Sequence, residues 1–481
     1  MKLFKIIKVI KFRYETSGGY KELLKISFPL ILSTASWSVQ HFVDRLFLSW
    51  YSAESIAASM PAGSLNFTIT SLFLGIASYV GVFVSQYFGA KKFHSISRVI
   101  WQGIYLSLLG AFIIFIISFF AFKIFLFFGH SEKIIFEEVI YFRILCYGAF
   151  FAISSSVLSS YFSGRGETPI VMWVNIAQTI VNIILDYFLI FGFKFFPKMG
   201  IEGAGIATVI SAIFAFFLYL ILISIDENRF KYNFWNSYKI DFKLIKQIIK
   251  FGFPAGIQFF VDMLAFSIFI LIIGKLGTLN LAASNIAFNI NSVAFMPMIG
   301  CGMAVSILVG QYLGANKEEL AEKTVYSGFH ITILYMSIIS FLYIFLPEIF
   351  IKPFLKDIES VHNLSEILKI LLRYVAFYSI FDSLNIIFGS ALKGSGDTKF
   401  IMKIIILCSI LFLILPSYIF IIVLKRDIFT AWKIVTIYIM SIAISFYFRF
   451  KKGVWKKIRV IETTKTIPTS FPEMPSKEFE L

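Results

Sequence analysis

Long apolar runs, separated by glycine, proline or clusters of charge, recur along the whole chain of 481 residues. Most runs reach the length of about 20 residues that an α-helix needs to cross the hydrocarbon core of a bilayer. Their apolar positions are continuous rather than alternating, which excludes the strands of a membrane β-barrel. The pattern predicts twelve helical spans, over residues 28–51, 62–88, 99–128, 136–162, 169–193, 203–225, 247–274, 281–313, 324–350, 364–391, 400–424 and 428–450.

The composition indicates an integral membrane protein of the all-α class. Hydrophobic residues make up 58% of the chain and charged residues 15%, which leaves too little polar surface to cover a water-soluble fold. The three cysteines, Cys146, Cys301 and Cys408, lie far apart in apolar stretches and have the spacing of neither a disulfide framework nor a metal site. Soluble enzymes, secreted disulfide-rich domains and disordered regulators are therefore excluded.

The charge of the chain is informative about its orientation. Lys and Arg number 44 and Asp and Glu 28, a net charge of +16 that in a membrane protein indicates topology and contact with anionic lipid rather than nucleic-acid binding. Most basic residues fall in the termini and in the loops after even-numbered spans. This bias predicts a multi-pass protein of the inner cell membrane with both termini cytoplasmic.

The two ends of the chain differ in character. The first 25 residues are basic and interrupted too often by lysine for a cleavable signal peptide, so they are predicted to form a cytoplasmic interfacial segment. Residues 461–481 contain three prolines and few apolar residues, and they are predicted to form a disordered tail.

Two stretches of the chain repeat each other. Residues 54–92 resemble residues 279–317, with QYFGAK at 86–91 matching QYLGAN at 311–316, and GRGET at 164–168 matches GSGDT at 394–398. The repeat predicts two homologous six-helix lobes at 1–225 and 247–460, joined by a cytoplasmic linker at 226–246. Because each lobe has an even number of spans, a pseudo-two-fold axis along the membrane normal relates them, an arrangement typical of alternating-access transporters.

Four aspartates lie within predicted spans, where a charge costs about 2.5–3.5 kcal/mol on insertion scales and marks a functional candidate: Asp44, Asp186, Asp262 and Asp382. Asn182 precedes Asp186 by one helical turn and Tyr378 precedes Asp382 by one turn, so each pair shares a helix face. Such a pair suits a proton or a hard cation. The alternative is a structural carboxylate neutralised by a neighbouring base.

Other polar residues in the spans have weaker claims. His41, one turn before Asp44, is either a proton partner or a satisfied core group. Arg45 is interpreted mainly as a snorkelling or structurally paired side chain, although it is a candidate modulator of the site. Asn66, Asn289 and Asn291 either line a cavity or lock helices together through hydrogen bonds, and packing is the favoured interpretation for each.

Taken together, these residues resemble the multidrug and toxic compound extrusion (MATE) family, within a superfamily that also contains polysaccharide and lipid flippases. The resemblance extends over all twelve predicted spans. It rests on the order and spacing of PLILSTASWSVQHFVDRLFL, SQYFGAKK with GQYLGANK, SGRGETP with KGSGDTK, VNIILDYFLIFG followed by GIEGAGIATVIS, and FGFPAGIQFFVD.

The resemblance implies export of small organic cations by antiport against Na⁺ or H⁺ through a V-shaped cavity between two lobes. It implies an N-lobe ion and substrate site at Asp44, Asn182, Asp186 and Thr208, and a C-lobe site, able to take Na⁺, at Asp262, Tyr378 and Asp382. Three positions depart from better-known members: Arg45 replaces a small residue, Asp186 an Asn of some members, and Asp262 a Glu common in sodium-coupled relatives.

Rival functions have less support in the sequence. A flippase for a lipid-linked sugar needs several cations to hold phosphate, yet the mid-span cations are only Arg45, Arg143 and Arg373. A membrane enzyme is disfavoured by five scattered histidines without a nucleophile motif, and a channel by the lack of a repeated filter segment. We expect no cofactor, a monomer in contact with membrane lipids, and a substrate and coupling ion that the sequence leaves open.

Overall fold

The computed structural model describes residues 13–192, 196–226, 229–354 and 361–462. The first lobe, which we call the N-lobe, contains α2 (Tyr20–Tyr51), α3 (Ala53–Gly89), α4 (Phe93–Ser118), α5 (Ala121–Phe128), α6 (Glu132–Tyr147), α7 (Ala149–Ser163), α8 (Thr168–Phe191) and α9 (Ile201–Ile225). A connecting segment carries α10 (Arg229–Tyr232) and η1 (Phe234–Asn236). The second lobe, the C-lobe, contains α11 (Phe242–Gly274), α12 (Thr278–Gly314), α13 (Glu318–Phe345), α14 (Pro347–Ile351), η2 (Lys352–Phe354), α15 (Val361–Ser395), α16 (Thr398–Cys408), η3 (Ser409–Ile414), α17 (Leu415–Ser417), η4 (Tyr418–Val423), α18 (Ile428–Lys451) and η5 (Val454–Lys457).

The helices confirm the predicted all-α membrane fold. Ten helices among the described residues are long and apolar enough to cross a membrane. The predicted first span lies in α2, whose serine, threonine and charged residues lower its hydropathy. The predicted fourth span is divided between α6 and α7, and with these two crossings the twelve spans are complete.

Several predicted spans are interrupted rather than continuous. The third breaks between α4 and α5 at residues 119–120, and the fourth breaks at Gly148, where a Cβ atom would lie 2.4 Å from Cγ2 of Val209. The ninth ends at Phe345, because Pro347 cannot continue the helical hydrogen bonding and instead begins α14. The eleventh widens into π-helix on both sides of Pro416, the residue that lacks a backbone N–H. Mean hydropathy shows none of these breaks, since the stretches around them stay predominantly apolar.

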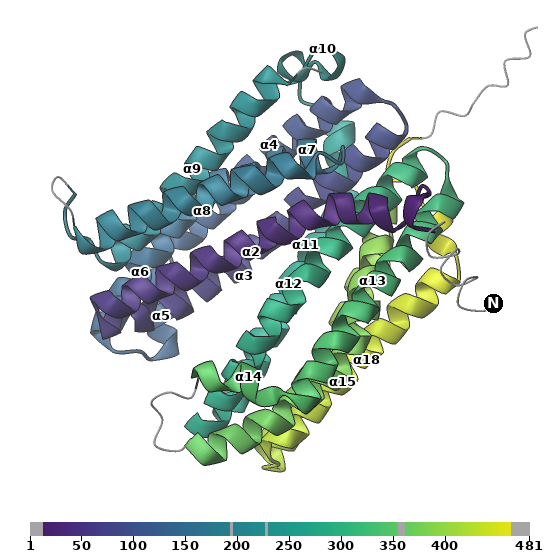
Figure 1. The fold of residues 1–481 in the computed structure, drawn as a ribbon. Helices are drawn as coiled ribbons and strands as arrows, with labels where there is room; N and C mark the ends of the chain where they lie inside the picture. The colour runs from purple at the N-terminus through teal and green to yellow at the C-terminus, as the bar shows by residue number, and fades with distance from the viewer. Residues whose placement is uncertain (1–12, 193–195, 227–228, 355–360, 463–481) are drawn as a thin grey trace, which may run out of the picture.

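The two lobes meet along four helices and diverge at one end (Figure 1). α3 packs against α11, and α2 packs against α12, a reciprocal arrangement that matches the sequence repeat. In Figure 1 the purple and blue N-lobe and the green and yellow C-lobe separate toward α5, α6 and α14. They come together at the other end, where the first and last described residues lie.

We call this second region the closed end, defined by Gln86, Gly164, Gln311 and Gly394. There Nε2 of Gln86 donates to the carbonyl of Gly394 at 3.2 Å, and Nε2 of Gln311 donates to the carbonyl of Gly164 at 2.8 Å. The two bonds cross the lobe interface in opposite directions. The repeated motifs QYFG/QYLG and GRG/GSG are thus the two halves of one symmetric inter-lobe contact.

The hydrophobic cores also cross between lobes near the closed end. Leu23, Ile26 and Leu30 of α2 belong to a core built mainly from α12, α13 and α15. Conversely, Leu244 and Ile248 of α11 belong to the N-lobe core. The first helix of each lobe therefore has one end anchored in the opposite lobe.

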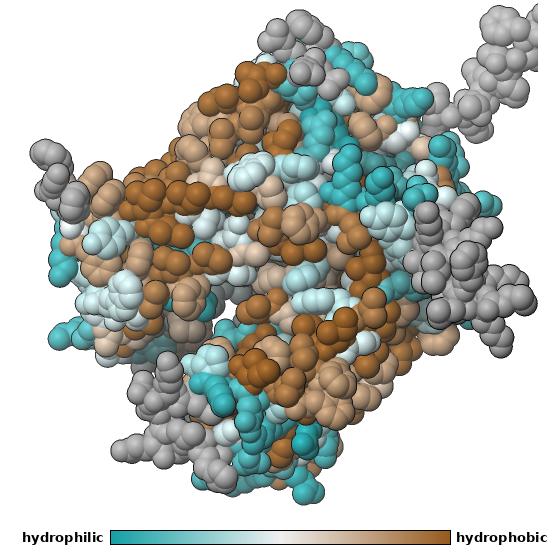
Figure 2. All heavy atoms as spheres, in the orientation of Figure 1, coloured by the Kyte–Doolittle hydropathy of each residue, from teal (hydrophilic) through white to brown (hydrophobic). Residues whose placement is uncertain are grey.

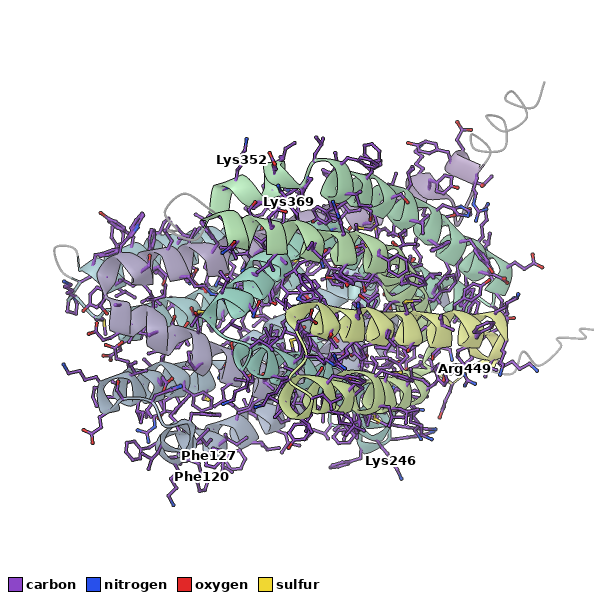
Figure 3. The ribbon with its side chains drawn as sticks, turned by 90° about the horizontal axis from the view of Figure 1, so that it is seen from below. Phe120, Phe127, Lys246, Lys352, Lys369 and Arg449 are labelled. Carbon is purple, nitrogen blue, oxygen red and sulfur yellow. The ribbon has the colours of Figure 1, made fainter. Side chains whose placement is uncertain are left out.

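The outer surface suits a lipid environment. Figure 2 shows hydrophobic side chains gathered over the middle of the molecule and hydrophilic side chains toward its ends. Phe120 and Phe127 point outward from the N-lobe (Figure 3), and Phe127 is 88% exposed. Exposed phenylalanines over such an area are costly in water and favourable in hydrocarbon, which agrees with a membrane-embedded surface.

Candidate functional site

The N-lobe site is built on one face of α8. Asn175, Thr179, Asn182 and Asp186 follow at intervals of three or four residues, so they share the face that packs against α2. Asn175 donates to the hydroxyl of Ser33, and the hydroxyl of Thr179 donates to the carbonyl of Ser36 at 3.3 Å. These bonds position α8 against α2. Asn175 and Thr179 were not predicted, although their spacing from Asn182 was visible in the sequence.

One turn further along this face, two predicted residues come together. Asp44 of α2 and Asp186 of α8 lie close enough to interact electrostatically, and their exposures are 6% and 0%. Oδ1 of Asp44, both carboxyl oxygens of Asp186 and both side-chain polar atoms of Asn182 have no hydrogen-bond partner within the described protein. Two ionised carboxylates are both acceptors and cannot satisfy each other, so this cluster suits a shared proton or a bound cation.

Tyr141 of α6 completes the surroundings of this pair. It is 9% exposed and lies within electrostatic range of both Asp44 and Asp186. Tyr141 was not predicted, because a single tyrosine in an apolar run carries no periodic signal.

The remaining N-lobe candidates are less central. Nδ1 of His41 lies 3.9 Å from Oδ2 of Asp44, and its side chain is 45% exposed, which places it at the edge of the carboxylate pair. Arg45 is exposed and within electrostatic range of His41 and Asp44. The hydroxyl of Thr208 donates to the carbonyl of Ala204 on its own helix at 3.0 Å. Its role in the site remains a prediction.

In the C-lobe, Asp382 and Tyr378 lie on the buried face of α15, at exposures of 5% and 2%. The Tyr378 hydroxyl accepts a hydrogen bond from Nδ2 of Asn291 on α12 at 3.3 Å, while Oδ1 of Asn291 has no partner within the described protein. Asn385 is within hydrogen-bonding range of Asp382. The structure thus places Tyr378 beside Asp382 and adds Asn291, for which packing was the favoured interpretation.

Asp262 of α11 lies near the cluster of Asp382 and Tyr378. Nε2 of Gln258, one turn earlier, donates to Oδ2 of Asp262 at 3.2 Å. Tyr438 of α18 is within electrostatic range of both Asp262 and Asp382, and its hydroxyl lies 3.3 Å from Oγ of Ser409. Lys393, at the end of α15, is within electrostatic range of Asp262. Tyr438 and Lys393 were both missed, since they are distant in sequence from the aspartates that they approach.

The two clusters are not copies of each other, although the lobes are. The N-lobe carboxylates come from the first and fifth spans of their half, and the C-lobe carboxylates come from the first and fourth. Within the described ranges, no three His, Cys, Asp or Glu side chains gather as ligands for a metal ion. The donors are instead carboxylate, amide and phenol oxygens, which suit protons and hard monovalent cations.

The arrangement of two six-helix lobes is shared with known proteins. The model of one protein family, MatE, matches residues 29–188 and 254–419, one segment in each lobe. The chain belongs to the MatE family. This membership confirms the predicted resemblance and makes the protein a membrane transporter rather than an enzyme.

Individual relatives extend the similarity over most of the chain. The probable multidrug resistance protein NorM of Thermotoga maritima is 24% identical over 384 residues, which cover 79% of this chain and 80% of the relative. The probable multidrug resistance protein YoeA of Bacillus subtilis is 27% identical over 373 residues, covering 76% and 80%. A solved structure, described as the outward-facing conformation of a multidrug resistance MATE family transporter, shares the fold with a TM-score of 0.80 at 20% identity, covering 92% of this chain and 97% of its own.

Proposed function

We propose that this MatE protein exports small organic cations by antiport against one monovalent cation, H⁺ or Na⁺. The observation that carries the proposal is the buried pair of Asp44 and Asp186, whose oxygens include three without a hydrogen-bond partner in the described protein. A cation bound there neutralises the pair, and an organic cation competes for the same negative charge. Mutual exclusion of ion and substrate is sufficient for coupling.

α2 provides a route from this site to the lobe interface. It carries Asp44, and its other end packs its Leu23, Ile26 and Leu30 into the C-lobe core. A change in the charge of Asp44 alters how α2 sits against α8, and that change is transmitted to the end that holds the opposite lobe. The helix is therefore the element through which ion binding biases the two lobe arrangements.

The orientation of the protein follows from its basic residues. Lys92, Arg98 and Lys243 lie at the closed end, together with the first and last described residues. By the positive-inside rule we assign this end to the cytoplasm, and the end at which the lobes separate then faces outward, as in an outward-open state. We further propose that the protein acts as a monomer in the inner membrane, in contact with lipid, with both termini cytoplasmic.

The substrate class is supported by the relatives and by the charge of the candidate sites. The NorM and YoeA relatives are both named as probable multidrug resistance proteins. Acidic clusters in both lobes favour cationic drugs over the phosphate of a lipid-linked sugar, which needs a basic cavity.

The test is efflux of ethidium from liposomes that contain the purified protein, with a sodium gradient and a proton gradient imposed separately. We expect one gradient to drive efflux, which names the coupling ion. Asp44→Asn and Asp186→Asn should each abolish driven efflux, whereas Asp427→Asn, in the loop before α18, should not. If the folded wild-type protein exports no ethidium under either gradient, the antiport proposal is wrong. If Asp44→Asn still shows gradient-driven efflux, the assignment of Asp44 to the ion site is wrong.

A further inference from the structure

The chain continues beyond α18 as a segment that is first fixed to the C-lobe. Trp455 is fully buried, stacks on Phe450 with ring centroids 4.8 Å apart, and donates Nε1 to the carbonyl of Phe450 at 2.9 Å. Lys456 forms an ion pair with Glu322, and Arg459 forms one with Glu318 at 2.7 Å, both on α13. The segment therefore leaves the C-lobe from a rigid starting point.

The next residues cross to the other lobe. Val460 and Ile461 are 2% and 4% exposed, and both belong to the N-lobe core, together with Leu244 and Ile248 of the crossing helix α11. The backbone N–H of Val460 donates to Oε1 of Gln86 at 3.0 Å, in a buried position. Val460 lies at the boundary, because a Cβ atom at Gly396 of the C-lobe would be only 2.8 Å from its Cγ2, and Ile461, six residues after Trp455, is packed in the N-lobe core.

This contact acts on the inter-lobe hydrogen bond already described. The amide oxygen of Gln86 accepts from Val460, and its amide nitrogen donates to Gly394 of the C-lobe. The segment from the C-lobe therefore fixes the orientation of the N-lobe amide that bonds back to the C-lobe. Its repeat counterpart Gln311 donates to Gly164 in the same way, but the described contacts give it no comparable backbone donor.

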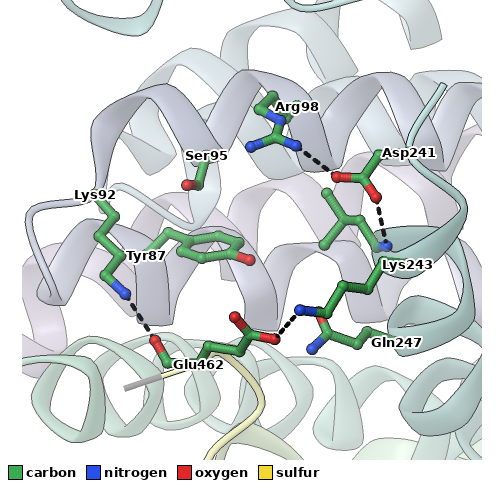
Figure 4. Close-up of a pocket in the computed structure, with 9 residues that line it drawn as sticks. Tyr87, Lys92, Ser95, Arg98, Asp241, Lys243, Gln247 and Glu462 are labelled. Carbon is green, nitrogen blue, oxygen red and sulfur yellow. Dashed lines mark hydrogen bonds and ion pairs between the residues drawn. The ribbon is translucent and has the colours of Figure 1, made fainter. Parts of the chain in front are cut away.

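A pocket of about 250 Å³ at the closed end receives the last described residue (Figure 4). Nζ of Lys92 donates to the carbonyl of Glu462 at 2.7 Å, and Nζ of Lys243 lies 2.6 Å from its carboxylate. Beside them, Arg98 pairs with Asp241 at 2.5 Å. The Lys243 and Glu462 side chains are 76% and 67% exposed, so their ion pair is screened and contributes little. The buried groups of Val460 and Ile461 carry most of the attachment.

We propose that residues 458–462 form a latch, the C-terminal latch, which holds the closed end shut and must leave the N-lobe before the lobes can separate there. Its two ends are fixed to different lobes, so it cannot keep both sets of contacts when Gln86 and Gly394 move apart. The latch stabilises the outward-open arrangement relative to the opposite one. The inference rests on the alternating access proposed above, but it concerns the cytoplasmic gate and not the ion or the substrate.

The first experiment compares two truncations. Stopping the chain after Arg459 removes Val460, Ile461 and Glu462, and stopping it after Glu462 keeps them, so the second truncation is the matched control. Opening of the closed end is measured by the labelling rate of a cysteine introduced as Ser85→Cys, at a fully buried position of the lobe interface. The three native cysteines are replaced in this background. The label is a membrane-impermeant maleimide applied to inside-out vesicles.

We expect the shorter chain to be labelled about tenfold faster than the full chain, equal to about 1.4 kcal/mol of gate stabilisation, and the control at the full-chain rate. The full-length double variant Val460→Ala/Ile461→Ala should also be labelled faster, which guards against misfolding of the truncation. Equal labelling of all four proteins would overturn the latch. This readout needs no substrate, so it stands even if ethidium is not exported.

A second experiment fixes the latch in place. Disulfide cross-linking of Lys92→Cys to Glu462→Cys should stop ion-driven efflux, and reduction should restore it. Undiminished efflux by the fully cross-linked protein would show that the latch does not need to leave, and the proposal would be wrong.

Discussion

Gly314, in the second copy of the repeated motif, is the position at which a single methyl group should change the balance between the two lobe arrangements. A Cβ atom there would lie 2.1 Å from the backbone carbonyl oxygen of Gln86, whereas ordinary contacts begin at 3.4 Å. A helix carbonyl cannot rotate away as a flexible side chain can. Gly314→Ala therefore forces α3 and α12 apart by about 1 Å at the closed end.

The size of the effect follows from the cost of overpacking, about 1–3 kcal/mol for an inserted methylene in a well-packed contact. The clash exists only while the closed end is shut, because the two helices separate when that end opens. The whole cost therefore shifts the equilibrium toward the inward-open state, by about 5-fold to 150-fold. The repeat makes the same prediction for Gly89→Ala, whose Cβ would lie 1.9 Å from the carbonyl of Gln311.

The assay is maleimide labelling of Ser85→Cys from the cytoplasmic side, with Gly314→Ala added. Gly274→Ala is the matched control, because its Cβ would meet its nearest neighbour, Cδ2 of Leu281, at an ordinary 3.8 Å. A faster rate for Gly314→Ala alone supports the reasoning. An unchanged rate in a folded, monodisperse Gly314→Ala variant would refute the view that this glycine contact holds the closed end shut.

Three further outcomes are expected. Gln311→Ala removes an inter-lobe hydrogen bond worth about 1 kcal/mol, so labelling of the same cysteine should rise about fivefold, and an unchanged rate contradicts this. Arg165→Leu removes the buried guanidinium that pairs with Asp226 at 2.8 Å, and it should lower the free energy of unfolding by about 3–5 kcal/mol. Thermal unfolding in detergent measures this loss, and Arg165→Lys should not restore the stability. Asp427 is the N-cap of α18, and hydrogen bonds from Thr430 hold the pKa of its carboxyl below the ordinary value. The ionised carboxylate therefore stabilises the folded state fully above the unfolded pKa of about 3.9. This stabilisation is lost as the pH falls through the lowered pKa of the folded state. Asp427→Asn keeps the cap and should flatten that part of the stability profile measured between neutral and acidic pH; a profile that stays as steep contradicts the assignment.

Much of the fold was determined by the sequence alone. A helix in lipid satisfies its own backbone, so the apolar runs identified the twelve spans without knowledge of their neighbours. The recurrence of Gln86 and Gly89 as Gln311 and Gly314 predicted two lobes, because a repeated motif can be recognised without knowledge of how the helices pack. The cost of burying charge singled out Asp44, Asp186, Asp262 and Asp382 as candidates, because that cost depends on the residue and its depth alone.

The tertiary structure decided which of these residues meet. A helical period defines the face that a residue shares with its own neighbours, but the partner of that face depends on how helices pack. Asp44 and Asp186 are 142 positions apart, as are Ser33 and Asn175, and only the packing of α2 against α8 brings them together. The break at Gly148 against Val209, the approach of Tyr141 and the crossing of the chain at Val460 and Ile461 into the N-lobe core arise in the same way. Each of these features depends on contacts between segments that are far apart in the chain, and such contacts cannot be predicted from local hydropathy.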